Sequence, residues 1–272
     1  MRIQTNATAN AAYKNLSVTG MQLSKSIEKL SSGFRINRSG DDASGLSIAN
    51  SLRSEGKALS VASRNATQGQ SVLDIADGSV NEITKIVDRL RELTATSASA
   101  NTSDSERTSL NAEFQQLAAE ISRTVQETSY QGTALVDGSF SSQNFRVGTD
   151  SGSTIAVTVG SIALTALGLS STTSISTSTL ASAALITIAG SSQTQLNSVI
   201  GQIGAAQNRF EYAVSTLAVR IANVSAAESV IRDLDIASET TKFTKLQVLQ
   251  QAGTAMLAQA NQLPQGVLSL LR

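Results

Sequence analysis

The sequence predicts a mainly α-helical protein: a long antiparallel helical bundle or coiled coil with a small β-hairpin region, and with its termini paired as a coiled coil. Two observations carry this prediction. Apolar residues recur at alternating intervals of three and four along most of the chain, a spacing that forms one stripe only on an α-helix. Proline occurs once in 272 residues, at Pro264, and a proline costs about 3 kcal/mol in a helix interior.

The two ends of the chain carry matching apolar ladders. The N-terminal ladder is Ala9, Tyr13, Leu16, Gly20, Leu23, Ile27 and Leu30. The C-terminal ladder is Leu246, Leu249, Gly253, Met256, Ala260, Leu263, Val267 and Leu270. Chain ends are normally the least ordered part of a domain, so ladders there predict that the ends pair with each other or with further copies of the chain. The larger members form the expected assembly seam: Leu16, Leu23, Ile27, Leu30, Leu246, Leu249, Met256, Leu263, Val267 and Leu270.

A loop and then a long helix follow the first ladder. Gly, Ser, Asn and Asp gather behind Ser31, and Asp41 or Asp42 is placed to cap the next helix. That helix keeps one three–four register except at Glu55 and Gly69. Its ladder is Leu52, Leu59, Ala62, Ala66, Leu73, Ala76, Val80, Ile83, Val87 and Leu90. A helix of this length is typical of a coiled coil or a bundle rod.

A stretch rich in Ser, Thr and Asn, from Thr94 to Ser103, is expected to end the long helix. Ser103 and Glu106 have the spacing of a capping box, which predicts that a second helix starts there. The ladder of that helix is Leu110, Phe114, Leu117, Ile121 and Val125. Because the break is short, we expect the two helices to pack antiparallel.

From about Tyr130 the helical pattern stops. Residues 144–147 and 155–159 alternate in polarity across a Gly/Ser turn, which predicts a β-hairpin. The tract from Ser170 to Ser178 is rich in Ser and Thr and predicts an exposed, solvated loop.

A last long helical stretch is expected to begin near Thr179. Its ladder is Leu196, Ile200, Ile203, Gln207, Phe210, Val214, Leu217, Ile221, Val224, Glu228 and Ile231. The residues Asp233, Leu234 and Asp235 separate this helix from the C-terminal ladder. The layout is therefore nested: paired ends enclose long helices, which enclose a short β-containing tip.

Composition argues against most catalytic chemistry. The chain has no Cys and no His, which removes thiolate chemistry, the commonest general base and the commonest metal ligands. We therefore expect no enzyme activity, no catalytic residue, no cofactor and no metal. The 21 basic and 21 acidic residues balance, which disfavours nucleic acid as a partner.

Neither a membrane span nor a secretory signal is expected. No run approaches the roughly 20 apolar residues that cross a bilayer. The first residues lack the apolar core of a signal peptide, so secretion would need another route.

Two long motifs lie near the two ends of the chain. Residues 30–38, LSSGFRINR, lead into residues 41–46, DDASGL, and residues 250–261, QQAGTAMLAQAN, are followed by residues 267–271, VLSLL. The first motif resembles the N-terminal pattern of bacterial flagellins, and the second resembles the C-terminal pattern of the same family. The resemblance covers roughly residues 1–140 and 180–272. It implies a minimal flagellin without large outer domains.

The resemblance also implies how the chain is divided. We expect inner coiled-coil helices at both ends, a spoke linker, rod helices and a variable tip. The expected ranges are 1–33 for the N-terminal inner coiled-coil helix, 34–46 for the spoke linker, 47–130 for the N-terminal rod helices, 131–178 for the β-hairpin and tip, 179–235 for the C-terminal rod helix and 236–272 for the C-terminal inner coiled-coil helix. Pro264 is an open point, since general rules favour a kink or an end before it and the resemblance favours a continuous helix.

A structural function and a set of partners follow from the same resemblance. The implied function is a secreted subunit of the extracellular flagellar filament, exported by the flagellar type III system, that assembles with itself for swimming motility. The implied partners are hook-associated and cap proteins, a flagellar export chaperone and a vertebrate Toll-like innate receptor. The positions that match the family's subunit- and receptor-contact strip are Arg89, Leu93 and Glu113.

Two rival interpretations stay open. A hook–filament junction protein has similar termini, and the start Met1-Arg2-Ile3 is of the kind such proteins show. The C-terminal motif and the Asp42-Ala43 pair favour flagellin. An adhesin or other ligand-binding surface protein would need a sizeable middle domain, which this chain lacks.

Overall fold

The computed structural model describes residues 6–170 and 172–270, with side chains described through residue 262. The chain divides into two compact units. The terminal unit contains both ends of the chain, residues 1–56 and 222–272, and the middle unit contains residues 57–221. The helices and short strand pairs confirm the predicted mainly α-helical class with a small β region.

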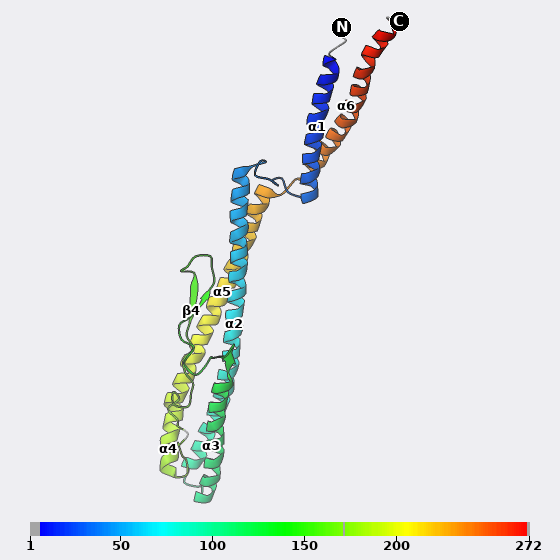
Figure 1. Ribbon diagram of the computed structural model, residues 1–272. Helices are drawn as coiled ribbons and strands as arrows, with labels where there is room; N and C mark the ends of the chain where they lie inside the picture. The colour runs from blue at the N-terminus through cyan, green and yellow to red at the C-terminus, as the bar shows by residue number, and fades with distance from the viewer. Residues whose placement is uncertain (1–5, 171, 271–272) are drawn as a thin grey trace. The chain divides into compact units, whose positions relative to one another are not determined.

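In the terminal unit, α1 (Ala7–Ser32) and α6 (Ile236–Leu270) pack side by side and antiparallel (Figure 1). The start of α2 (Ala43–Ala98) and the end of α5 (Gln193–Arg232) complete this unit. Asp42 caps α2, since its Oδ1 accepts the Gly45 N–H at 2.8 Å, which confirms the expected cap. The backbone of α6 stays helical through Pro264, so the open point is resolved in favour of a continuous helix.

A short backbone ladder joins the α1–α2 loop to the α5–α6 loop within the terminal unit. Gly33 ends α1 with φ +73°, a left-handed conformation that glycine adopts without strain. The next residue, Phe34, forms an antiparallel bridge with Asp233. The Leu234 N–H donates to the Gly33 carbonyl at 3.0 Å, and the Arg35 N–H donates to the Arg232 carbonyl at 2.7 Å.

The middle unit packs the rest of α2 with α3 (Asp104–Glu127), α4 (Ser178–Thr187) and most of α5. The π-helix η1 (Ile188–Ser192) joins α4 to α5. Along the chain, two antiparallel strand pairs follow α3 and precede α4. They are β1 (Ser129–Tyr130) with β2 (Thr133–Ala134), and β3 (Gln143–Arg146) with β4 (Thr154–Val157). The β3–β4 pair is the predicted hairpin, with Asn144 opposite Ala156.

The core of the middle unit lies along the predicted ladder of α2. From Leu59 to Leu90 every member of that ladder is buried. Gly69, which breaks the ladder, has a packing reason: a Cβ at this position would come within 2.7 Å of the Phe210 ring. That ring is fully buried and meets Phe145 edge-on, with ring centroids 5.4 Å apart. The glycine therefore makes room for the largest side chain of this part of the core.

The long helix ends inside the stretch that was expected to end it, since α2 continues past Thr94 and stops at Ala98. Thr94 and Ser97 are buried, and their hydroxyls donate to the carbonyls of Leu90 and Ile175. These hydroxyls bond to acceptors within reach instead of competing with the helix, so a Ser/Thr-rich sequence remains helical here.

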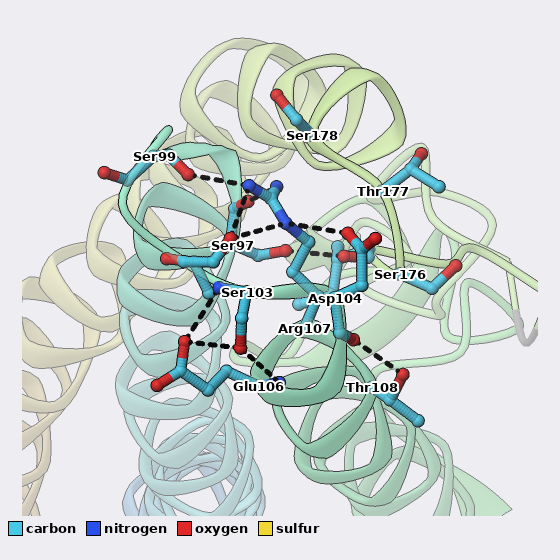
Figure 2. Close-up of polar contacts among 12 residues, drawn as sticks. Ser97, Ser99, Ser103, Asp104, Glu106, Arg107, Thr108, Ser176, Thr177 and Ser178 are labelled. Atoms are coloured by element: carbon cyan, nitrogen blue, oxygen red, sulfur yellow. Dashed lines mark hydrogen bonds and ion pairs between the residues drawn. The ribbon is translucent and has the colours of Figure 1, made fainter.

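Arg107 of α3 closes the C-terminal end of α2 (Figure 2). Its guanidinium is nearly buried and donates to the carbonyls of Ser97, Ser99 and Thr102, the last two at 2.8 and 3.0 Å. The helix end has carbonyls that its own backbone does not satisfy, and the arginine satisfies them. The predicted capping box of Ser103 and Glu106 is present in both directions at the start of α3.

The expected exposed loop from Ser170 to Ser178 is also wrong in part. Ile175 is fully buried, and its N–H donates to Asn111 Oδ1 of α3 at 2.8 Å. The preceding irregular segment buries four further apolar residues, Ile162, Leu164, Leu167 and Leu169. This segment has no helical or alternating period, so sequence pattern did not mark it as core.

One continuous helical stretch, Ser178–Arg232, is long and apolar enough to cross a membrane by length and composition alone. Such a single stretch is weak evidence for a membrane span. Within the middle unit, Leu196, Ile203 and Phe210 of this stretch are core residues of the helical bundle.

Candidate assembly surfaces

The seam between α1 and α6 is narrow and made largely of small or polar residues. On α6 the side chains that lose exposure recur at alternating intervals of four and three: Glu239, Phe243, Leu246, Gln250, Gly253, Leu257 and Ala260. The matching positions on α1 are Ala9, Ala12, Leu16, Thr19, Leu23, Ser26 and Leu30. Small residues let the helices approach closely: a Cβ on Gly253 would meet the Leu16 side chain at 3.1 Å. The pairing therefore depends on fit rather than on a large apolar core.

A buried polar pair lies in this seam. Ser26 Oγ donates to Glu239 Oε1 at 2.7 Å, and both residues are buried. Lys242 Nζ lies 3.6 Å from the same carboxylate oxygen, at the edge of the seam. At the far end of the pair, the Asn6 side-chain amide donates to the Ala260 carbonyl at 2.8 Å. A buried polar contact in a coiled coil penalises other registers, because a shift would leave it unpaired.

Large apolar residues lie outside this seam on both helices. Eight of them are exposed among the described side chains of α1 and α6: Tyr13, Val18, Met21, Ile27, Ile236, Val248, Leu249 and Met256. Tyr13 and Met256 are each 65% exposed. Hydrophobic burial contributes about 1.5–3 kcal/mol for each such side chain, and the free chain leaves most of that unrealised. Exposed apolar patches of this kind mark interaction surfaces.

Four of these residues form two stripes on opposite faces of the helix pair. On α1, Tyr13 and Ile27 each follow a seam residue by one position; we call them the α1 stripe. On α6, Leu249 and Met256 each precede a seam residue by one; we call them the α6 stripe. In an antiparallel pair, positions one after the seam lie on one face of both helices, and positions one before it lie on the other face. Each copy therefore presents one apolar stripe on each face.

The structure divides the predicted assembly seam between these two environments. Leu23 and Leu246 are buried and Leu16 and Leu30 half-buried between α1 and α6. Ile27, Leu249 and Met256 face outward. The remaining three predicted members, Leu263, Val267 and Leu270, lie outside the residues with described side chains. The role of the whole set in assembly stays a prediction.

The linker between α1 and α2 is held in a defined shape by charge and hydrogen bonding. Asp41 Oδ2 accepts the backbone N–H groups of Arg38 and Asn37 at 3.1 and 3.2 Å. These two bonds, that from Arg38 first, hold the pKa of the Asp41 carboxyl below its usual value. Ile36 is buried, and a Cβ on Gly45 would come within 2.8 Å of its side chain. The motif residues of the linker thus have local structural reasons, and none of these contacts suggests acid–base chemistry.

The predicted contact strip on α2 and α3 is only partly at the surface. Arg89 donates to Glu113 at 2.8 Å and to Glu92 at 2.9 Å, and all three side chains are exposed. The hydrogen bond to Glu92, and then that to Glu113, raise the pKa of the Arg89 guanidinium. Leu93 is only 2% exposed and belongs to the core of the middle unit. Arg89 and Glu113 lie together at the surface, and Leu93 does not join them there.

Sequence reasoning missed Glu239, Ser26 and Arg107, because polar residues did not fit the apolar ladders. The spacing could have identified two of them once the seam was known, because Glu239 lies seven residues before Leu246 and Ser26 lies three residues after Leu23. Among the described residues, no group of three or more His, Cys, Asp or Glu side chains gathers closely enough to hold a metal ion.

Comparisons with known proteins agree along nearly the whole chain. The family model described as the bacterial flagellin N-terminal helical region matches residues 3–141, and that described as the bacterial flagellin C-terminal helical region matches residues 186–271. A flagellin of Halalkalibacterium halodurans is 39% identical over 276 residues, and flagellin FlaB1 of Treponema pallidum is 38% identical over 287 residues. A flagellin of Bacillus subtilis is 34% identical over 304 residues. All three alignments cover 100% of this chain and 100% of the relative.

Proposed function

Because this chain belongs to the bacterial flagellin family, we infer that it is a structural subunit that assembles with copies of itself into the flagellar filament. The filament is extracellular and serves swimming motility, so the work of the protein is mechanical. The family is structural rather than enzymatic.

The observation that carries this proposal is the pair of apolar stripes on opposite faces of the terminal helix pair. A contact that joins the α1 stripe of one copy to the α6 stripe of the next uses two different surfaces. Such a head-to-tail contact leaves one stripe of each kind free at the ends, so addition continues into a ring or an open helix. Two identical stripes on one face would instead favour a closed dimer.

The predicted division of the chain fits this mechanism. We propose that residues 1–33 and 236–272 form the inner coiled-coil part of the filament, with residues 34–46 as the spoke linker. Residues 47–130 and 179–235 would supply the rod helices, and residues 131–178 the hairpin and tip. The support is the helix pairing of α1 with α6 and the compact linker around Asp41.

The remaining partners are proposals that rest on family membership. They are export by the flagellar type III system with a chaperone, capping by cap proteins and attachment through hook-associated proteins. Recognition by a vertebrate Toll-like receptor would use the Arg89–Glu113 surface. Because Leu93 is buried, the proposed receptor contact reduces to the two charged side chains and their neighbours.

The rival function, a hook–filament junction protein, makes a different prediction about where the protein occurs. Antibody labelling of intact flagella should mark the filament along its whole length. Labelling confined to the base of the filament would support the junction protein instead.

The direct experiment is polymerisation of the purified chain. Short filament fragments serve as seeds, and electron microscopy measures filament length over time. We expect long helical filaments from the wild-type chain, and shorter or no filaments from a variant that carries Ile27→Ser and Leu249→Ser. These side chains are exposed, so circular dichroism of the free variant should match the wild type. A wild-type chain that stays monomeric with seeds would contradict the proposal.

A further inference from the structure

The sulfur chemistry of this chain is confined to methionine, and the two methionines with described side chains are both exposed on the terminal helices. The chain has no Cys and three Met. Met256 of α6 is 65% exposed, and Met21 of α1 is 59% exposed. Met1 lies outside the described residues. Solvent access is the main condition for oxidation of a thioether by a peroxide.

The two methionines occupy different places around the helix pair. Met256 belongs to the α6 stripe together with Leu249, which lies about two helical turns away on the same face. Met21 lies two positions from the seam residues Thr19 and Leu23, which places it on the side of α1 that points directly away from α6. Only Met256 therefore lies in a stripe that the proposed head-to-tail contact covers.

We propose that the Met256 thioether is an oxidative modification site that controls whether a free subunit can join the filament. The reagent is a hydroperoxide, such as hydrogen peroxide in the medium. With hydrogen peroxide, the sulfur lone pair attacks one peroxide oxygen and the O–O bond breaks. The proton on the attacked oxygen passes to the departing hydroxide, so that an S=O bond forms and water leaves. The sulfur is oxidised by two electrons and the peroxide is reduced by the same two.

Oxidation changes the surface without changing the fold of the free chain. Met256 is not one of the seam residues and is 65% exposed, so a sulfoxide there remains solvated in the monomer. In the filament the same sulfoxide would lie in the apolar contact with the neighbouring copy. Burying a polar group without a hydrogen-bond partner is unfavourable, and the expected loss in the affinity for addition is about tenfold or more. Subunits already in the filament have Met256 covered and react slowly.

This inference rests on the proposed assembly function, and the test separates the two. Full-length chain is treated with hydrogen peroxide, the oxidant is removed, and oxidation at each methionine is measured by peptide mass spectrometry. Seeded polymerisation then follows, with untreated chain alongside. Untreated chain that fails to polymerise would contradict the proposed function; untreated chain that polymerises while treated chain does not supports the oxidation site.

Matched variants assign the effect to one side chain. Met256→Leu keeps the apolar stripe and should polymerise equally well before and after peroxide treatment. Met21→Leu, which removes a sulfur of similar exposure outside the stripes, should remain peroxide-sensitive. Both variants retain Met1. Reduction of the treated wild type by methionine sulfoxide reductases should restore polymerisation.

Three results would overturn the inference. The first is treated wild-type chain, oxidised at Met256, that adds to seeds at the untreated rate. The second is a Met256→Leu variant that stays as peroxide-sensitive as the wild type, which would assign the effect to Met21 or Met1. The third is equal oxidation rates for Met256 in monomer and filament, since the proposed contact covers this side chain.

Discussion

The terminal unit and the middle unit differ in where most of their large apolar side chains lie. In the middle unit, Phe114, Phe210 and Leu73 are fully buried, and the surface ion pairs lie outside. In the terminal unit, Tyr13, Ile27 and Met256 are exposed, while the seam contains Ala12, Ser26 and Gly253. The middle unit thus has a core of its own. The terminal pair leaves most of its large apolar side chains exposed, and we propose that neighbouring copies cover them.

Truncation of Phe210 should cause the largest loss of stability and should separate the two units most clearly. Phe210→Ala removes a ring that fills the space above Gly69 and contacts Phe145. We expect the middle unit to lose about 3–5 kcal/mol, as measured by urea unfolding followed by circular dichroism. Met256→Ala in the terminal unit should change the stability of the free chain by less than about 0.5 kcal/mol. Equal losses in the two variants would show that the units do not differ in this way.

A smaller loss is expected at the end of α2. Arg107→Ala removes the guanidinium donor from the carbonyls of Ser97, Ser99 and Thr102, and because Ser97 is fully buried, water cannot replace the donor there. We expect the middle unit to lose about 2–3 kcal/mol. Arg91→Ala, at an exposed position on α2, is the control and should have little effect. Hydrogen exchange of the last turn of α2 locates the change, and unchanged protection there would refute the cap.

The terminal unit should respond to loss of its buried polar pair. Glu239→Ala leaves Ser26 Oγ buried without its acceptor and should destabilise the α1–α6 pair by about 1–2 kcal/mol. The double variant with Ser26→Ala should recover part of that loss, because neither partner is then left unpaired. The measurement is proteolysis of the free chain within α6. Strictly additive effects would show that the two residues do not act together.

The smallest expected effect is on the dependence of the unfolding free energy on acidic pH. The pKa of Asp41 is lowered in the terminal unit by the backbone N–H groups of Arg38 and then Asn37, and that of Asp137 is lowered in the middle unit by Ser139. A lowered pKa adds stability above the ordinary carboxyl pKa, and this stability is lost as the pH falls through the lowered value. Asp41→Asn should therefore flatten the acid dependence of the terminal unit only, and Asp137→Asn that of the middle unit only. Urea unfolding from pH 2 to pH 6 tests both; an effect of each variant on the other unit would contradict this assignment.

Helix existence and the main apolar registers could be predicted from the sequence, because long three–four ladders have one physical interpretation. The ladder from Leu59 to Leu90 is buried as expected. The terminal ladders were ambiguous. From Leu16, a seam can continue through Tyr13 or through Ala12, and hydrophobicity favours the tyrosine. The structure uses Ala12 because small residues permit the close approach seen at Gly253, and this leaves Tyr13 outside.

Contacts between segments far apart in the sequence could not be predicted. Arg107 as the cap of α2, Ile175 in the core and the Ser26–Glu239 pair each depend on a partner that no local pattern specifies. The Ser/Thr content near Thr94 and Ser170 indicated loops, since isolated hydroxyls favour turns. In the folded chain the hydroxyls of Thr94 and Ser97 donate to the carbonyls of Leu90 and Ile175, which removes that preference near Thr94, and the Ser174 hydroxyl donates to Asn111 Oδ1.

The central claim is that the α1 stripe of one copy binds the α6 stripe of the next. The most direct measurement uses two variants in analytical ultracentrifugation: Tyr13→Ser with Ile27→Ser, and Leu249→Ser with Met256→Ser. We predict that each variant alone stays monomeric, and that an equal mixture forms dimers through its one intact pair of stripes. Dimers of either variant alone, with no gain on mixing, would contradict the claim.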